Sequence, residues 1–310
     1  MLRSALAVSV LLASGAIATP TKTRNVPSGV AARDTEPSSY PGGDGDACTN
    51  EFQYLNFDVS DDAQLTRVKA IHQAACTGLP QLLVLGYENL SDDDKTVFGR
   101  FFSNDDDTND EVGQVYSALV DTSNGEFTSI VADMIIDNND FQAYCTESGG
   151  DGGSDDGGEN LGYEDTDDAD GLEKFHLCDT SFNDFPTLPS DNECGETLDH
   201  PDINMDSLSR LLLHEMLHYS TVGEDIFGSR IVDVLNQDSE RAYYPQRAHG
   251  LVDADQDDDA ASAVTNADSY AWHATNSYFK YACNNVEEPG PNGGNWNDPP
   301  AYTAGEPGDA

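Results

Sequence analysis

The sequence predicts an α+β domain that is mainly helical and spans residues 45–285 of the 310-residue chain. Apolar residues recur with helical spacing in several segments of that span, whereas only two short runs have the composition of strands. The chain shows no internal repeat, and a span of this length is ordinary for one domain with a sizeable core. We therefore expect a single helical domain with a small strand component.

The segments outside this domain have the compositions of processed or disordered regions. Residues 1–18 hold Arg3, a short apolar run and small residues, which is the pattern of a secretory signal peptide. Residues 19–44 are polar and rich in Pro, Ser and Gly, and we interpret them as a propeptide or a disordered arm. Residues 286–310 are rich in Pro, Gly and Asn and predict a disordered tail. The expected mature protein is secreted.

Four segments of the first half carry secondary-structure signals. Helical spacing predicts a helix over 62–76, and a Ser-x-x-Asp cap opens a second predicted helix over 91–102. The apolar runs QLLVLGY at 81–87 and FTSIVADMII at 127–136 are expected to be strands. We expect the second of these strands at the edge of a substrate cleft.

Acidic residues dominate the surface chemistry, because the formal net charge is -44. The stretches 104–110 and 149–171 contain little apolar material and predict solvated loops, the second as an acidic insertion in the domain. A field of this sign repels polyanions, so nucleic acids and anionic membrane surfaces are excluded as natural partners. Protein or peptide substrates, cationic ones in particular, are the expected partners of a monomeric protein.

The chain has six cysteines. In an oxidising compartment an even number predicts disulfides, and because no two of them form a CxxC pair, a cysteine-based zinc site is not expected. The short segment between Cys178 and Cys194 suggests a local disulfide between these two residues. His72 and His176 lie in a predicted helix and a predicted strand, and we interpret both as structural.

The pattern HEMLH from His214 to His218 is the most informative motif of the chain. Residues four apart lie on the same face of a helix, so both histidines can direct a ring nitrogen at one zinc ion, with Glu215 beside them as general base. Chance produces such a pattern in roughly one of a hundred chains of this composition. The motif therefore predicts a zinc peptidase.

The residues around this motif predict a buried helix over 205–220, with Asn204 or Asp206 as its N-cap. Apolar side chains cover the faces that the two histidines do not use. A helix of this kind suits an active site, because its single polar strip can face a cleft.

A catalytic zinc needs a third protein ligand from outside this helix. The HExxHxxGxxH arrangement is not met, because Thr221 stands at the position of its glycine. A glutamate on a second helix, as in thermolysin-like enzymes, is a further possibility. The candidates are Glu240, Asp225, Asp233 and Asp268.

The C-terminal part of the domain resembles the fungal deuterolysin or aspzincin peptidases, which include lysine-specific metallo-endopeptidases. The resemblance covers about residues 205–283. It rests on HEMLH, on DVLNQDSERAYYPQRAHGL at 233–251, and on TNADSYAWHATNSYFKYAC at 265–283, which is similar to the family's Asn-Ala-Asp-x-Tyr helix. The resemblance implies a zincin-like metalloprotease domain whose active-site helix carries the HExxH motif.

The family's third ligand is an Asp in a Gly-Thr-x-Asp-x-x-Tyr-Gly segment, which implies Asp233 as ligand and Tyr243 as the corresponding Tyr. This chain lacks the Gly-Thr, has a longer Asp-to-Tyr spacing, and carries Tyr244 where the family has Gly. Asp268 corresponds to the acidic group that lines the substrate pocket in members preferring Lys, and Ala271 stands where some members carry a second acid.

Motif and resemblance together predict a secreted zinc metallo-endopeptidase with a preference for Lys after the scissile bond. The HEMLH histidines and Asp233 would hold Zn²⁺, Glu215 would move the proton, and Tyr243 would stabilise the oxyanion. Two alternatives stay open. One is a secreted binding protein or effector that keeps the fold without turnover, and the other is a gluzincin-type peptidase with Glu240 as third ligand.

Overall fold

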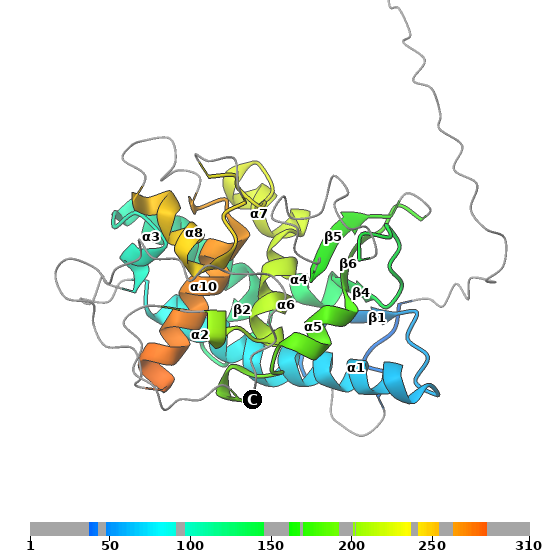
Figure 1. The fold of residues 1–310 in the computed structure, drawn as a ribbon. Helices are drawn as coiled ribbons and strands as arrows, with labels where there is room; N and C mark the ends of the chain where they lie inside the picture. The colour runs from blue at the N-terminus through cyan, green and yellow to red at the C-terminus, as the bar shows by residue number, and fades with distance from the viewer. Residues whose placement is uncertain are drawn as a thin grey trace, which may run out of the picture. The chain divides into compact units, whose positions relative to one another are not determined.

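The structure is a computed structural model, and the part of it described below is the unit from Asp34 onward. The expected signal peptide, most of the expected propeptide and the expected C-terminal tail lie outside the described residues. The described residues are 37–42, 48–90, 97–145, 161–167, 170–191, 201, 203–236, 241–253 and 263–283. They form an α+β unit that is mainly helical, which confirms the predicted class (Figure 1).

A four-stranded sheet with the order β1-β4-β6-β5 forms one side of this unit. The strands are β1 (Gln53–Leu55), β4 (Ile135–Asp137), β6 (Glu173–Leu177) and β5 (Gly162–Thr166). β1, β4 and β6 are parallel, whereas β5 pairs antiparallel with β6. β5 is therefore an edge strand, and it is the edge that contacts the HEMLH helix.

The predicted strand at 81–87 is wrong, because these residues belong to helix α2 (Leu79–Glu88). α1 (Asp62–Gln73) agrees with the helix predicted at 62–76, and a short π-helix, Ala74–Gly78, joins it to α2. The apolar run has helical periodicity, because α2 buries residues that lie three and four apart. These are Leu79, Leu82, Leu83 and Gly86.

The strand predicted at 127–136 is interrupted by a helix. Phe127 ends β3 (Glu126–Phe127), which pairs with β2 (Val120–Asp121), and α4 (Ser129–Asp133) follows before β4 begins. β4 lies inside the sheet between β1 and β6, so the prediction that this segment edges the cleft is also wrong. The pattern misled because α4 has the same apolar composition as the strands beside it.

The acidic stretch 149–171 is not only solvated loop, because it contains β5. The charges beside this strand are compensated by Lys174 of β6, whose side chain is 2% exposed. Its Nζ lies 2.8 Å from Asp167 Oδ2 and 2.7 Å from Asp170 Oδ2. Two carboxylates of the stretch that was predicted to be solvated, Asp167 and Asp170, are therefore paired with Lys174 in the fold.

The acidic stretch 104–110 is likewise not a loop, because α3 (Asp106–Leu119) begins within it. The Asp105 side chain caps the helix by accepting a hydrogen bond from the Thr108 amide. Acidic residues in the first turn also interact favourably with the helix dipole. For the helix predicted at 91–102, the described part holds only a 3₁₀ turn, Phe98–Arg100.

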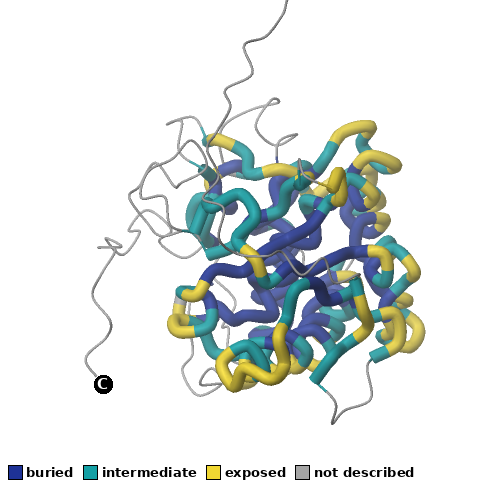
Figure 2. The backbone as a smooth tube through the Cα atoms, turned by 90° about the vertical axis from the view of Figure 1, so that its right-hand side faces the viewer, coloured by how far each residue is buried: buried dark blue, intermediate teal, exposed yellow. Residues whose placement is uncertain are grey.

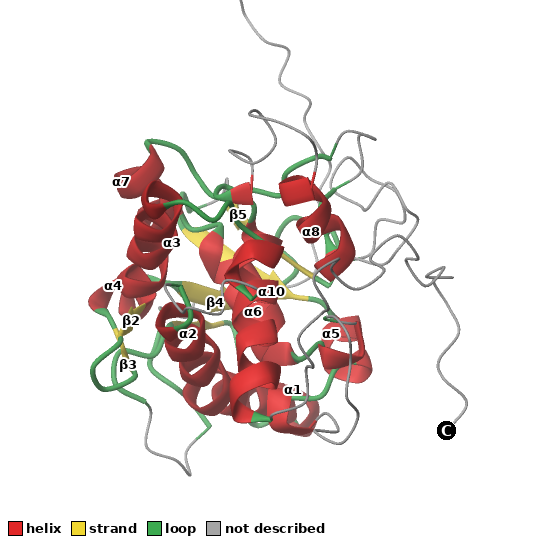
Figure 3. Cartoon of the chain, turned by 90° about the vertical axis from the view of Figure 1, so that its left-hand side faces the viewer, coloured by secondary structure: helices red, strands yellow, loops and turns green. Residues whose placement is uncertain are grey.

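The HEMLH helix, α6 (Leu208–Leu217), is buried at every residue. It lies between β5 of the sheet and α10 (Ala267–Ser277), as Figures 1 and 3 show, and Figure 2 shows that buried residues fill the interior of the described unit. Its N-cap is Ser207, whose side chain accepts a hydrogen bond from Arg210, and not Asn204 or Asp206 as predicted. The other α-helices of the described residues are α5 (Asp179–Asp184), α7 (Ser220–Phe227) and α8 (Tyr244–Asp253).

Disulfides join Cys48 to Cys76 and Cys145 to Cys178, each with a Cα–Cα distance of 5.5 Å. The predicted pairing of Cys178 with Cys194 is therefore wrong, because β6 ends beside Cys145 and takes that cysteine as partner. Cys283 is disulfide-bonded as well.

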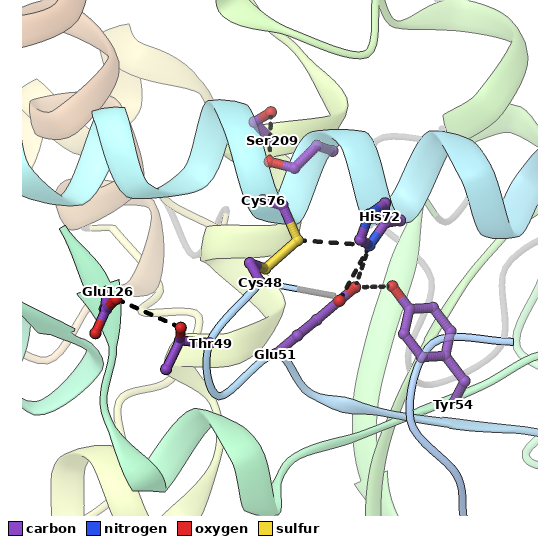
Figure 4. Close-up of a disulfide and its surroundings, with 9 residues drawn as sticks. Cys48, Thr49, Glu51, Tyr54, His72, Cys76, Glu126 and Ser209 are labelled. Atoms are coloured by element: carbon purple, nitrogen blue, oxygen red, sulfur yellow. Dashed lines mark hydrogen bonds and ion pairs between the residues drawn. A yellow bond between two sulfur atoms is a disulfide. The ribbon is translucent and has the colours of Figure 1, made fainter. Parts of the chain in front are cut away.

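The disulfide between Cys48 and Cys76 lies at the end of α1 (Figure 4). His72 of that helix contacts Glu51 at 2.9 Å, and Glu51 also accepts a hydrogen bond from the Tyr54 hydroxyl. His72 is therefore an internal partner of Glu51, which agrees with its structural interpretation. None of the described helices is long and apolar enough to cross a membrane.

Candidate metal centre

Three side chains from two segments converge at the C-terminal end of α6. His214 and His218 lie one helical turn apart on that helix, and Asp233 lies on the segment between α7 and α8. The two histidine Nε2 atoms are 3.2 Å apart. Asp233 Oδ1 lies 3.3 Å from His214 Nε2 and 3.4 Å from His218 Nε2. The three atoms therefore form a nearly equilateral triangle.

The size of this triangle matches the ligand set of a small tetrahedral metal ion. Zinc binds imidazole nitrogen and carboxylate oxygen at about 2.0–2.1 Å in tetrahedral geometry, which separates neighbouring ligand atoms by about 3.3–3.4 Å. Two histidines and one carboxylate leave the fourth position for water or substrate, as a catalytic zinc requires. The donor set therefore fits zinc without rearrangement.

The outer nitrogen of each histidine has an acceptor that fixes the ring. Nδ1 of His214 donates to Asp268 Oδ1 at 2.7 Å, and Nδ1 of His218 donates to the Ile231 carbonyl at 3.0 Å. With Nδ1 protonated, the lone pair of each Nε2 is directed at the centre of the triangle, which is how metal-binding histidines are commonly held.

The third corner of the triangle is a buried atom without a hydrogen-bond partner. Asp233 Oδ1 is one of the described buried side-chain atoms for which no partner is present. Its Oδ2, in contrast, accepts from the Tyr243 hydroxyl at 2.9 Å and from Arg241 at 3.3 Å. Leaving a buried acceptor unsatisfied is costly, so this oxygen is placed where it could bind a cation at the centre.

The electrostatics of the centre also favour a cation. Burial disfavours the charged form of His218, but the neighbouring Asp233 carboxylate raises the pKa of His218 to about 10. Burial acts in the opposite direction on Asp233, yet His218 and His214 hold the pKa of Asp233 well below its usual range. Negative potential that holds protons here would equally hold a divalent cation, which displaces them.

Glu215 lies beside the metal ligands and is 3% exposed. Burial raises the pKa of Glu215 above its ordinary value. A carboxylate with a raised pKa is a better proton acceptor near neutral pH, which suits a general base. β5 packs closely here, because a Cβ atom at Gly162 would lie 2.7 Å from Glu215 Oε1.

The centre forms the floor of a cleft of about 360 Å³. β5 and α6 contribute to its lining, together with residues 230–233, 241, 243 and 244. Its lining includes Tyr144, Gly162, Glu164, Arg230, Val232 and Arg241.

Asp268 supports His214, and although it is among the residues that line the cleft, both of its carboxylate oxygens already accept hydrogen bonds. It is 2% exposed. Its Oδ1 accepts from His214 and from Arg210 at 2.7 Å, and its Oδ2 accepts from the Tyr244 amide at 2.8 Å. Arg210 is held in turn by Asp206 at 2.6 Å. Asp268 therefore fits neither the role of third ligand nor that of a lysine-binding acid.

The remaining candidates for a third ligand are not placed at the centre. Asp225 is exposed on α7 and does not belong to the converging group. Glu240 lies outside the described residues. Among the candidates within the described part of the chain, Asp233 is the one that the fold brings to the two histidines.

The backbone at Tyr244 has φ 69°, a left-handed conformation that favours glycine. Tyr244 is the residue for which the expected resemblance implied a glycine position. Its amide points at Asp268, and the preceding Tyr243 donates to Asp233. In this arrangement the Tyr243 hydroxyl donates its proton to Asp233, a contact that the sequence did not suggest.

Two other groups of His, Cys and acidic residues are not metal sites. The cysteines of both groups are joined in disulfides, so they offer no thiolate. His176 Nδ1 donates to the Asp137 carbonyl at 2.7 Å, which agrees with a structural role.

The residues that sequence reasoning missed are the supports of the centre. Asp206 lies just before α6 and Arg210 lies on it. Their spacing of four residues could have indicated an ion pair. No signal in the sequence indicated Gly162, Glu164 or Arg241.

No protein-family model matches this chain, and no curated protein matches it significantly. The function therefore has to be inferred from the geometry of the centre.

Proposed function

We propose that the protein is a secreted zinc metallo-endopeptidase with a zincin-like fold. One observation carries this proposal: His214 Nε2, His218 Nε2 and Asp233 Oδ1 lie 3.2–3.4 Å apart, with Glu215 beside them at the floor of a cleft. The resemblance of residues 205–283 to deuterolysin-like peptidases supports the same interpretation. Disulfides and a signal-peptide pattern are consistent with secretion.

The roles of the residues follow from their positions. His214, His218 and Asp233 hold the metal, and Asp268 and the Ile231 carbonyl keep the two imidazoles in orientation. A bound zinc ion supplies Lewis acidity, which polarises the peptide carbonyl and makes water a better nucleophile.

Glu215 is placed to move the proton. It accepts the proton of the attacking water and returns it to the leaving amine, so that one carboxylate serves as base and then as acid. Its burial beside Gly162 excludes bulk water from this step and holds the carboxylate in one position.

The expected preference for Lys rested on Asp268 together with the overall negative field, and the Asp268 carboxylate is engaged by His214, Arg210 and the Tyr244 amide. We therefore propose the peptidase activity without this preference.

The proposal is tested with Glu215→Gln, which keeps the shape of the side chain and removes its basicity. We expect stoichiometric zinc in both wild type and variant, and casein turnover at least about a thousandfold lower in the variant, because general base catalysis contributes factors of about 10²–10⁴. Glu224→Gln is the matched control, since Glu224 is 57% exposed on α7. It should retain full activity.

Equal turnover by wild type and Glu215→Gln would refute the peptidase mechanism. Zinc bound by both proteins with turnover by neither would instead support a binding protein that keeps the site without catalysis.

A further inference from the structure

Three arginines line the cleft, Arg210, Arg230 and Arg241, in a chain with 14 basic and 58 acidic residues. The first is fully neutralised. Arg210 is 5% exposed and is held by Asp206 at 2.6 Å and by Asp268 at 2.7 Å. It has no capacity for a ligand and serves the metal centre.

Arg230 is paired as well, with three carboxylates of the described residues. Its guanidinium lies 3.2 Å from Glu164, 3.1 Å from Glu173 and 3.9 Å from Glu224. Burial raises the pKa of Glu164 to about 8, and the charge of Glu173 acts in the same direction. The positive charge of Arg230 is therefore already compensated by these neighbours.

Arg241 is held much more weakly than the other two. Among the described residues, one carboxylate lies within ion-pair distance of its guanidinium, with 3.3 Å to Asp233 Oδ2, and its side chain is 29% exposed. That oxygen already accepts the closer Tyr243 hydroxyl at 2.9 Å. The other oxygen of Asp233 faces the histidines, so this carboxylate is shared among the metal centre, Tyr243 and Arg241.

The chemistry of a guanidinium defines what Arg241 can bind. It has five N–H donors in a planar fork that matches a carboxylate, and it cannot lose its proton at physiological pH. The protein's overall negative field favours cations at long range, but salt screens it beyond about 8 Å under physiological conditions. Short-range contacts inside the cleft therefore determine which substrate binds. The cleft group with the weakest existing contact is the positively charged Arg241 guanidinium.

We propose that Arg241 binds a carboxylate of the substrate, so that the cleft selects peptides that carry a carboxylate close to the scissile bond. This inference rests on the proposed peptidase function and names its substrate class. The carboxylate can come from an Asp or Glu side chain or from a free C-terminus, and matched peptides distinguish these two sources.

The experiment compares pairs of peptides that differ only in one carboxylate. One pair carries Glu or Gln at each position next to the scissile bond, and the other ends in a free acid or an amide. For wild type we expect kcat/KM about tenfold higher for the carboxylate member of one pair, the gain typical of a charge-assisted hydrogen bond. The preferred pair identifies the source, and its ratio should fall as salt rises.

Arg241→Gln should reduce this ratio to about one, whereas Arg241→Lys should retain part of it because the charge remains without the fork. Arg67→Gln is the matched control. Arg67 lies on α1, pairs with Asp179 of α5, and does not line the cleft. It removes the same charge from the molecule and should leave the ratio unchanged. Zinc content is measured on every variant, because Arg241 contacts Asp233.

A second readout does not depend on turnover. In the Glu215→Gln background, fluorescence anisotropy should show about tenfold tighter binding of the labelled carboxylate peptide than of its neutral partner, and Arg241→Gln should remove this difference. Wild type that cleaves both members of each pair equally would overturn the inference and leave the peptidase function standing. An equal loss of rate on all peptides in Arg241→Gln would also overturn it. Absence of both cleavage and binding would overturn the proposed function together with the inference.

Discussion

At the scale of single residues, the candidate centre is a chain of buried charges. Asp206 holds Arg210, Arg210 holds Asp268, and Asp268 holds the His214 ring. Each partner reduces the cost of burying the next, since an isolated buried charge is strongly unfavourable. The chain ends at Asp233 Oδ1, the described atom of the centre that still lacks a partner.

Asp233→Ala should lower the zinc affinity by more than about a hundredfold, because even residues that only orient a ligand change metal affinity by about 10–100-fold. The affinity is measured by competition with a chelating dye at fixed pH. Asp225→Ala is the control, since Asp225 is exposed on the neighbouring helix α7. Unchanged affinity in the Asp233 variant would remove this residue from the ligand set.

At the scale of elements, the centre depends on the close approach of β5 to α6. Gly162 faces Glu215 across this contact, and its missing side chain is what permits the approach. The neighbouring Tyr163 is buried against His176 of β6, so the strand cannot move outward without losing its packing. The position of the proposed general base is thus set by a glycine on another element.

Gly162→Ala is expected to destabilise the protein by about 1–3 kcal/mol and to lower kcat, because overpacking forces backbone or side-chain shifts. The added Cβ would meet Glu215 Oε1 at 2.7 Å and the His176 carbonyl at 3.0 Å. Thermal unfolding and peptide turnover measure the two effects.

The matched control is Gly250→Ala on α8, where a Cβ has nothing within 4 Å. That variant should be neutral or stabilised by up to about 1 kcal/mol, since alanine favours a helix. If both glycine variants behave alike, the contact between β5 and Glu215 does not constrain the site.

At the scale of the whole molecule, strong acidity coexists with a well-formed core. The net charge of -44 opposes compaction, and the buried aromatic and aliphatic residues, together with the disulfides, offset it. The Cys145–Cys178 disulfide joins β6 to the segment that carries Tyr144, a residue of the cleft lining. This cross-link therefore contributes to both stability and the cleft.

Replacing Cys145 and Cys178 together by Ala should lower the free energy of unfolding by about 3–4 kcal/mol, since the cysteines are separated by 33 residues and closing such a loop restricts the unfolded chain. Urea unfolding measures the loss. Peptide mapping of the unreduced protein should recover Cys145 joined to Cys178. A peptide that joins Cys178 to Cys194 would contradict this pairing.

The sequence by itself determined the class of the fold and the core of the candidate centre. The spacing of apolar residues was sufficient to predict α1 and α6, because the buried face of a helix requires apolar side chains three and four residues apart. The proximity of His214 and His218 could also be predicted, since residues four apart on a helix lie on the same face. The choice among the candidate third ligands, in contrast, needed the fold, because Asp233 reaches the two histidines only where the segment between α7 and α8 returns to α6.

Only the tertiary structure decided the supports of the centre and the edge of the cleft. β5 lies in a Gly- and Asp-rich stretch that looks solvated, and it becomes a strand because β6 offers pairing and Lys174 offers charge compensation. The apolar run of α2 could have been a strand until its packing against α10 was known. The roles of Arg241 and Gly162 depend on contacts with residues distant in sequence. Such contacts produce no local sequence pattern, so these roles could not be predicted from the sequence.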